Sequence, residues 1–177
     1  MIRNKQDLRE YNAADYVANK FSRLSPFYDI RYKFLRVLRK VEYLQNCKSR
    51  HSIRYAYYFY KLYRLSVLSG LTIPPNTFGK GLYIPHYGSI VVNGSARFGD
   101  YCIVQNGVNI SSGVIGGEHI YLGAGCKILT NVHIADNVII GANAVLVDNV
   151  QEVNIVVAGI PAKRISNKGM ASSRDYI

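Results

Sequence analysis

The sequence has no long apolar run and few cysteines. No stretch approaches the roughly 18 apolar residues of a membrane span, and Met1–Lys5 leads into polar sequence instead of the apolar core of a secretory signal. The three cysteines (Cys47, Cys102 and Cys126) are odd in number and form no Cys-x-x-Cys pair, which argues against a disulfide framework. We therefore expect reduced thiols and a cytoplasmic protein.

Acidic residues are scarce in the first part of the chain. Residues 1–70 contain 15 Lys and Arg against 5 Asp and Glu, a net charge of +10, whereas residues 71–177 contain 7 against 6. This asymmetry predicts an anionic partner, such as an acidic glycan, nucleic acid or the inner face of the membrane, to which the protein would bind peripherally. The alternative is a solvated basic helix face with no partner.

Residues 1–70 show helical periodicity. A weak helix is expected over residues 6–21, and Ser25-Pro26 suggests the N-cap and first turn of a longer one. One apolar stripe follows at helical spacing, and four basic residues lie off it: Arg31, Arg36, Arg39 and Lys40. A last helix is expected from about Ile53 to Leu68, ending at Gly70.

Tyrosines are concentrated in this last helix. Tyr55, Tyr57, Tyr58, Tyr60 and Tyr63 alternate with basic residues, and aromatic rings beside cations can stack on nucleic-acid bases. No recognised nucleic-acid motif accompanies them. We therefore expect a packing face and no nucleic-acid partner.

From about Thr72 the period changes to six. Ten positions recur without a break, and nine of them are large and apolar: Val92, Phe98, Val104, Ile110, Gly116, Leu122, Ile128, Ile134, Ile140 and Leu146. Apolar residues, most of them small or β-branched, recur four positions later: Ala96, Cys102, Val108, Val114, Ile120, Cys126, Val132, Val138, Ala144 and Val150. Two extra residues near Ile90 shift the phase. A sustained six-residue repeat indicates a parallel β-helix, whose coils bury their apolar side only by stacking.

The repeat carries a family resemblance. The stretch Ile84-Pro85-His86-Tyr87-Gly88-Ser89-Ile90-Val91-Val92, with the segments 122–128, 140–145 and 157–163, resembles the serine acetyltransferase branch of the hexapeptide-repeat acyltransferases. The basic helical part is similar to the shorter O-acetyltransferases of bacterial surface-polysaccharide clusters. The resemblance covers roughly residues 71–165.

The resemblance implies the architecture. We expect an α+β chain, mainly β, with a basic helical region (1–70), a left-handed parallel β-helix catalytic domain (71–165) and a loosely ordered polar C-terminal tail (166–177). It also implies a homotrimer with one active site in each groove between neighbouring prisms. The reaction it implies is transfer of an acetyl group from acetyl-CoA to a hydroxyl group.

Histidine suits this chemistry because a neutral imidazole can take the proton from an attacking alcohol. Of the four histidines, only His86 matches the family motif, so it is the candidate catalytic base. His51 is expected at the surface, and His119 and His133 at turn-like positions of the repeat. The thioester is already activated, so no metal is expected.

The resemblance also assigns cofactor contacts by position. Ser112, Ala124 and Ala142 match the family's contacts to coenzyme A, where small residues leave room for the pantetheine arm. Lys163 and Arg164 follow the Ala-Gly-Ile-Pro-Ala signature and are candidates for binding the nucleotide phosphates.

The sequence departs from true serine acetyltransferases around the acceptor. Those enzymes have an Asp directly before the catalytic histidine, where this chain has Pro85. They have a second Asp fifteen residues before the same histidine, where this chain has Leu71. Residues Ile110–Gly116 keep the repeat and leave no room for the Arg-His loop that grips the serine carboxylate. A hydroxyl of a neutral or acidic sugar or glycan, free or lipid-linked, is therefore favoured over L-serine. A backbone carbonyl, Tyr87 and Asn106 remain candidates for orienting His86. Tyr87 and Asn106 are also candidates for binding the acceptor.

Two other classes of function remain open. β-Helical carbonic anhydrases hold zinc between subunits with three histidines, but equivalent faces recur every 18 residues, and His86, His119 and His133 do not align at that spacing. A non-catalytic scaffold would keep the fold without binding acetyl-CoA. Serine O-acetylation remains the alternative within the favoured class.

Overall fold

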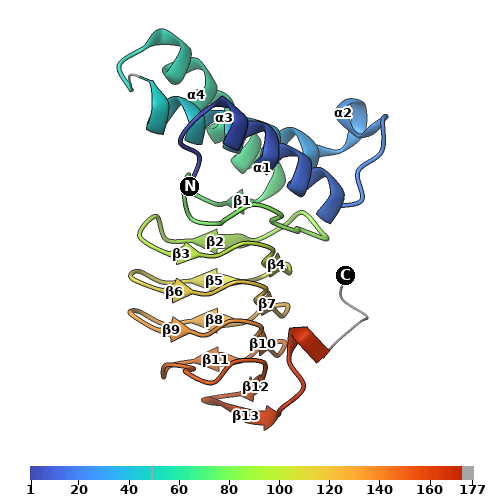
Figure 1. Cartoon of the computed structure of the whole chain (residues 1–177), viewed down its shortest axis with the longest axis vertical. Coiled ribbons are helices and arrows are strands. Elements are labelled where there is room, and N and C mark those ends of the chain that lie inside the picture. Colours follow the sequence, from blue (N-terminus) through green and yellow to red (C-terminus); the bar gives the residue numbers. More distant parts are fainter. Residues whose placement is uncertain (49, 173–177) are drawn as a thin grey trace.

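The computed structural model describes residues 1–48 and 50–172. A helical part sits on one end of a stack of coils, as Figure 1 shows. Its helices are α1 (Lys5–Ala18), α2 (Ser25–Tyr28), α3 (Ile30–Cys47) and α4 (Ile53–Ser69).

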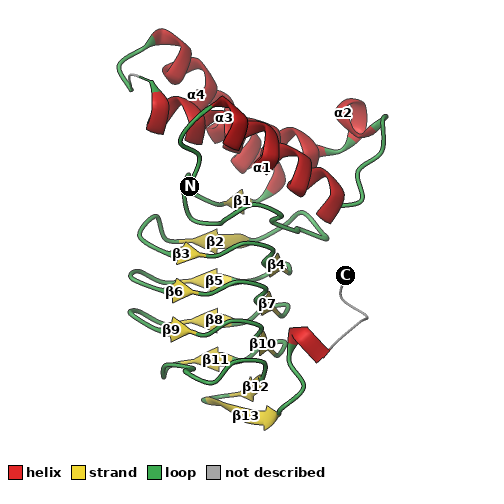
Figure 2. Ribbon diagram, in the orientation of Figure 1, coloured by secondary structure: helices red, strands yellow, loops and turns green. Residues whose placement is uncertain are grey.

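The coils form three sheets that run along a prism (Figure 2). Sheet A contains β1 (Leu71–Thr72), β2 (Ile90–Val92), β5 (Asn109–Ile110), β8 (Lys127–Ile128) and β11 (Val145–Leu146). Sheet B contains β3 (Arg97–Phe98), β6 (Ile115–Gly116) and β9 (His133–Ile134). Sheet C contains β4 (Ile103–Val104), β7 (Tyr121–Leu122), β10 (Ile139–Ile140), β12 (Val156–Gly159) and β13 (Ala162–Ser166). All neighbouring strands pair in parallel except β12 and β13, which form a closing antiparallel hairpin. We name the edges of the prism by the sheets they join: AB, BC and CA.

The predicted left-handed parallel β-helix is confirmed. Both sets of recurring apolar positions are buried inside the prism. The first set has one small member, Gly116, and a neighbouring ring explains why no larger residue fits there. A β-carbon at this position would lie 2.3 Å from a ring carbon of Phe98. Phe98 stacks on Phe78 with ring centroids 4.9 Å apart, so it fills the volume that Gly116 leaves empty.

The predicted helices are present, with two corrections. The last helix ends as expected at Gly70, which has the left-handed φ of 70°. Ser25 does not cap the long helix: it begins the separate one-turn helix α2, and Asp29 caps α3 by accepting a hydrogen bond from the Arg31 amide. The second correction concerns Arg39, which lies off the apolar stripe but is completely buried.

The tyrosine-rich face of α4 differs from the expected packing face. Tyr55 and Tyr58 pack against the core, but Tyr57, Tyr60 and Tyr63 are 58–61% exposed in the single chain. The inward side of α4 is formed by Leu62 and Leu65 and the other side remains open, because one apolar stripe is enough to pack the helix on α3.

The C-terminal tail is less loose than expected. The amides of Gly169 and Met170 donate to the carbonyls of Asn154 and Asn137 at 2.9 Å each, and a 3-10 turn follows at Met170–Ser172. Met170 is buried against Ile103 and Ile139, so residues 169–172 cover part of sheet C. The rest of the expected tail, residues 173–177, lies outside the described residues.

Two of the three cysteines are part of the core. Cys102 and Cys126 point into the prism, and burial raises the pKa of both thiols to about 12. Both are therefore neutral at physiological pH, which makes them poor nucleophiles. None of the described helices is long and apolar enough to cross a membrane.

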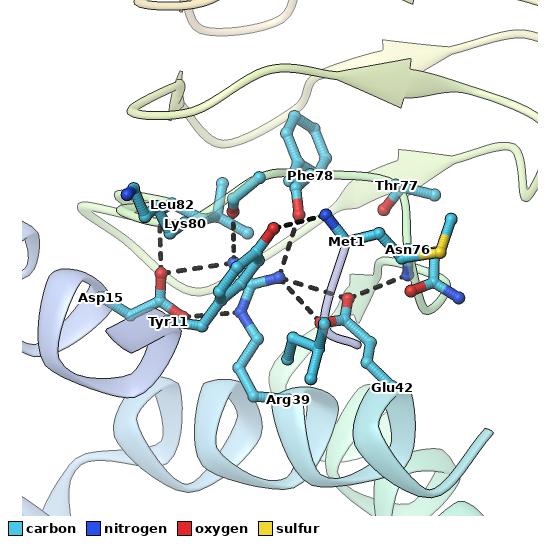
Figure 3. Close-up of polar contacts among 12 residues, drawn as sticks. Met1, Tyr11, Asp15, Arg39, Glu42, Asn76, Thr77, Phe78, Lys80 and Leu82 are labelled. Carbon is cyan, nitrogen blue, oxygen red and sulfur yellow. Dashed lines mark hydrogen bonds and ion pairs between the residues drawn. The ribbon is translucent and has the colours of Figure 1, made fainter. Parts of the chain in front are cut away.

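Buried Arg39 joins the helical part to the first coil (Figure 3). Its Nε donates to Asp15 at 2.7 Å and its Nη1 to Glu42 at 3.0 Å. The same guanidinium donates to the carbonyls of Phe78 at 3.0 Å and Gly79 at 2.6 Å. Burial alone would lower the pKa of Arg39, but the two carboxylates outweigh it and raise the pKa above its ordinary value.

The two carboxylates extend the network to other backbone groups of the first coil. Asp15 accepts from the Leu82 amide at 3.0 Å, and Glu42 accepts from the Asn76 amide at 2.8 Å. The Tyr11 ring lies 5.0 Å from the Arg39 guanidinium, and the Tyr11 hydroxyl accepts from the N-terminal ammonium at 2.6 Å. Every charged group of this buried cluster therefore has partners, as burial in a low dielectric requires.

We predict that Arg39→Met lowers the free energy of unfolding by about 3–5 kcal/mol, because it leaves Asp15 and Glu42 buried without their cation. Urea unfolding followed by circular dichroism measures the change. Arg36→Met is the matched control, since Arg36 lies on the same helix but is exposed. Equal stability of the two variants would contradict the role given to Arg39.

Candidate active site

His86 lies in an irregular turn at the head of the CA corner. The segment from Tyr83 to Val91 is two residues longer than its counterpart from Ile103 to Asn109 in the next coil. The extra length makes the turn bulge from the prism, and Gly88 within it has a φ of 131°, which L side chains rarely adopt. The phase shift seen in the sequence is therefore the turn that presents His86.

The side chains of His86 and Tyr87 point outward. Both residues are exposed, and Tyr87 is 68% exposed. Among the described residues no group forms a hydrogen bond with the His86 imidazole, so neither Tyr87 nor Asn106 orients the ring within one chain. The His86 side chain is therefore open to solvent, where a substrate hydroxyl could reach it.

The CA corner continues below His86 with small residues. Asn106, Ala124 and Ala142 occupy equivalent turns of the next three coils, and the Asn106 and Ala124 carbonyls accept from the next turn down at 2.9 and 2.8 Å. Asn106 lies directly below Gly88, its β-carbon 3.9 Å from where a Gly88 β-carbon would stand. The structure thus brings five of the predicted residues to one edge: His86, Tyr87, Asn106, Ala124 and Ala142.

Lys163 and Arg164 lie in β13, the last strand of the hairpin that closes the prism. In the closing hairpin Lys163 pairs with Ala158, which packs against the Gly141 beside Ala142. Both cations are exposed, Lys163 with its Nζ 3.5 Å from Asp148 and Arg164 in an ion pair with Glu152. Asp148 lies in the AB turn of the last coil and Glu152 in its BC turn, so both cationic side chains reach away from the CA corner. The CA corner therefore runs from an imidazole past small residues to the closing hairpin.

Ser112 lies elsewhere. It belongs to the AB corner, where its carbonyl accepts from the Asn131 amide at 2.9 Å and its side chain is exposed. A different edge of the prism separates it from His86. One chain alone does not bring Ser112 to the predicted cofactor groove.

The other histidines are dispersed. His119 is in the BC corner, stacked on Tyr101 with centroids 5.2 Å apart. His133 lies in strand β9 and not in a turn, and His51 precedes α4. Within residues 1–48 and 50–172, no three His, Cys, Asp or Glu side chains lie together in a manner that suits a metal ion.

The structure also brings to the His86 turn residues that the sequence analysis missed. Asn19 accepts from the Ile84 amide at 3.0 Å, and Arg31 donates to the carbonyls of Ile84 at 3.0 Å and Pro85 at 2.5 Å. On the other side of the turn, the Gly88 amide donates to Ser69 at 2.8 Å. The only signal in the sequence was the position of Arg31 off the apolar stripe, which does not reveal its partner.

No protein-family model and no curated protein matches the chain. Solved structures do match over nearly its whole length. The serine acetyltransferase of Neisseria gonorrhoeae superposes with a TM-score of 0.76 at 23% identity, covering 97% of this chain and 73% of that protein. The serine O-acetyltransferase of Brucella melitensis, described as a bacterial transferase hexapeptide-repeat protein, gives 0.73 at 26%, covering 93% and 68%. The chain has the fold of the hexapeptide-repeat acyltransferases.

A third match links this acyltransferase fold to the cofactor. A serine acetyltransferase determined in complex with CoA has a TM-score of 0.75 and 24% identity, covering 91% of this chain and 71% of that protein. The matches extend over the helical part as well as the coils, and they confirm the resemblance seen in the sequence. In this chain Leu71 is fully buried in the core, and only the four residues 111–114 join β5 to β6.

Proposed function

We propose that the protein is an acetyl-CoA-dependent O-acetyltransferase that acts on a hydroxyl group of a sugar or polysaccharide precursor. The observation that carries the proposal is the CA corner, where an exposed imidazole heads a line of small residues. The matched serine acetyltransferases, one of them with CoA, support the acetyl donor.

In the proposed reaction, neutral His86 removes the proton from the acceptor hydroxyl as its oxygen attacks the thioester carbonyl. Backbone N–H groups near the turn stabilise the oxyanion that forms. When the carbon–sulfur bond breaks, the imidazolium returns its proton to the sulfur, and the products are the O-acetyl ester and free CoA thiol. His86 takes up one proton and releases one proton in each turnover, so the proposed proton transfers need no metal ion.

The small side chains of Ala124 and Ala142 leave room for the pantetheine arm along the CA corner. For Lys163 and Arg164 to bind the nucleotide phosphates, their side chains would exchange Asp148 and Glu152 for the phosphates and turn toward the groove. Ser112 can join this groove only from a second chain, because it stands on another edge of the prism. We therefore propose a homotrimer in which the AB corner of one prism faces the CA corner of its neighbour.

The proposed class of acceptor follows from charged side chains that serine acetyltransferases have and this chain lacks. An amino acid would bring a carboxylate into a site whose Asp and Arg-His partners are absent, since Pro85, Leu71 and the unlooped Ile110–Gly116 segment replace them. The net charge of +10 over residues 1–70 favours an acidic or lipid-phosphate-linked glycan. The exposed tyrosines and basic residues of α4 suit a peripheral position at a membrane surface.

His86→Ala is predicted to lower kcat by a factor of about 10² to 10⁴, because it removes the general base. Calorimetric titration should show an unchanged Kd for acetyl-CoA. His133→Ala is the control, since His133 is also exposed but lies in sheet B. Near-wild-type turnover of the His86 variant would contradict the proposed mechanism. Failure of the wild-type protein to bind acetyl-CoA would favour a non-catalytic scaffold.

The protein is predicted to be a trimer of roughly 60 kDa, three times the 19.9 kDa chain. Multi-angle light scattering at micromolar concentration measures the mass, and equilibrium dialysis should give one CoA per chain. A monomer that binds CoA with full stoichiometry would show that the groove does not need a second prism.

L-Serine is predicted to be a poor substrate and a sugar hydroxyl a good one. Placing the serine carboxylate in the site without a cationic partner would cost several kcal/mol. Acetyl-CoA consumption with L-serine, compared with a panel of neutral and acidic oligosaccharides, measures the preference. For an acidic acceptor kcat/KM should fall steeply with salt; efficient turnover of L-serine would exclude the proposed acceptor class.

A further inference from the structure

The turn that carries His86 takes its shape from the helical part and not from the coils. Ladder bonding to the coil below ends at Tyr83, whose carbonyl accepts from the Val104 amide at 2.9 Å, and resumes at Val91, whose amide donates to Val108 at 2.9 Å. Between these points Asn19, Arg31, Ser69 and Gly70 of the helical part bond to the backbone of the turn.

Arg31 makes the contacts nearest to His86. A single nitrogen, Nη1, donates to the consecutive carbonyls of Ile84 and Pro85 at 3.0 and 2.5 Å. Pro85 directly precedes His86. Its ring fixes its φ, so its ψ is the remaining soft torsion that sets where the next residue points. A hydrogen bond that fixes the Pro85 carbonyl fixes this ψ.

Asp29 holds the guanidinium in place. Its two carboxylate oxygens accept from Nε and Nη2 of Arg31 at 3.1 and 2.7 Å, which is the forked geometry that arginine forms with carboxylates. Partial burial would by itself raise the pKa of Asp29, but the hydrogen bonds from Arg31 outweigh it and lower the pKa. The Phe21 ring lies 5.7 Å from the guanidinium. Arg31 is thus restrained on two sides before it reaches the turn.

We propose that Arg31, held by Asp29, is a positioning residue for His86 that fixes the direction of the imidazole through the Pro85 carbonyl. The proposal rests on the O-acetyltransferase function proposed above. It assigns a task to the helical part: the orientation that a carboxylate bonded to the ring would provide is supplied here by restraint of the backbone.

The first test is kinetic. Arg31→Met should lower kcat by about 10- to 100-fold, because small misplacement of a catalytic group slows the reaction by such factors. The Kd for acetyl-CoA should be unchanged, since the Arg31 side chain bonds to the backbone of the His86 turn and to Asp29, and not to Ala124 or Ala142. Arg31→Lys should recover only part of the loss because an ammonium lacks the planar fork. Turnover is measured with the most active oligosaccharide of the panel, and Arg36→Met is the control on the same helix.

A chemical rescue separates positioning from folding. Millimolar guanidinium chloride should restore part of the kcat of Arg31→Ala and leave Arg36→Met unaffected. These concentrations are far below those that denature proteins. Urea unfolding should show the Arg31 variants folded at the assay temperature. A loss of kcat that guanidinium does not restore, or that appears equally in Arg36→Met, would overturn the proposal.

The second test needs no acceptor. In protein labelled with ¹⁵N in its histidine rings, Arg31→Met should shift or broaden the ring signals of His86 and leave those of His119 and His133 unchanged. Signals of His86 identical to wild type would overturn the proposal. If the wild-type protein fails to acetylate any acceptor but this selective change still occurs, the proposed function fails while the positioning role of Arg31 stands.

Discussion

The first coil of a parallel β-helix has an open edge, because no coil precedes it and its outward backbone N–H and C=O groups lack partners. In this chain polar side chains of α1 and α3 replace the missing coil. Asp15, Asn19, Arg31, Arg39 and Glu42 bond to backbone groups between Asn76 and Pro85. An unpaired buried backbone group costs about as much as a lost hydrogen bond. The fold of the coils therefore depends on a helical part with these five side chains at these positions.

The same requirement explains part of the chain's unusual charge. Arg39 and Arg31 belong to the basic excess of residues 1–70, but neither belongs to a solvated face: Arg39 is completely buried, and the Arg31 side chain is 21% exposed. Both are anchored by carboxylates and use the remaining donors on backbone carbonyls of the first coil. Arginine suits this task because it has five donors and remains charged when buried. The excess that remains for a partner is carried by the exposed lysines and arginines.

Local and long-range order were not equally predictable. The β-helix could be predicted because each coil repeats the same short pattern, and its single exception, Gly116, was visible although its cause, the ring of Phe98 one coil earlier, was not. His86 could be singled out as a candidate because a motif surrounds it. The contacts of Arg39 and Arg31 with the backbone of the first coil join residues 39 to 54 positions apart, and helical periodicity contains no information about such partners. The break at Asp29 was missed for a related reason: Ser25-Pro26 is a good helix start, and Asp29 is a second one four residues later.

Holding the His86 turn from the helical side has a consequence for the chemistry. A carboxylate that orients a catalytic histidine occupies one ring nitrogen, so that only the other meets the substrate. If the proposed restraint through the Pro85 carbonyl orients His86, neither ring nitrogen needs a partner within the described residues of its own chain, and the exposed side chain can meet groups from outside it. One nitrogen can take the proton of the acceptor hydroxyl while the other bonds to a group of the neighbouring prism or of the acceptor itself. In a trimer this second contact would fix the tautomer of His86 only when the groove is assembled, which couples the chemical competence of the base to the presence of its partner chain.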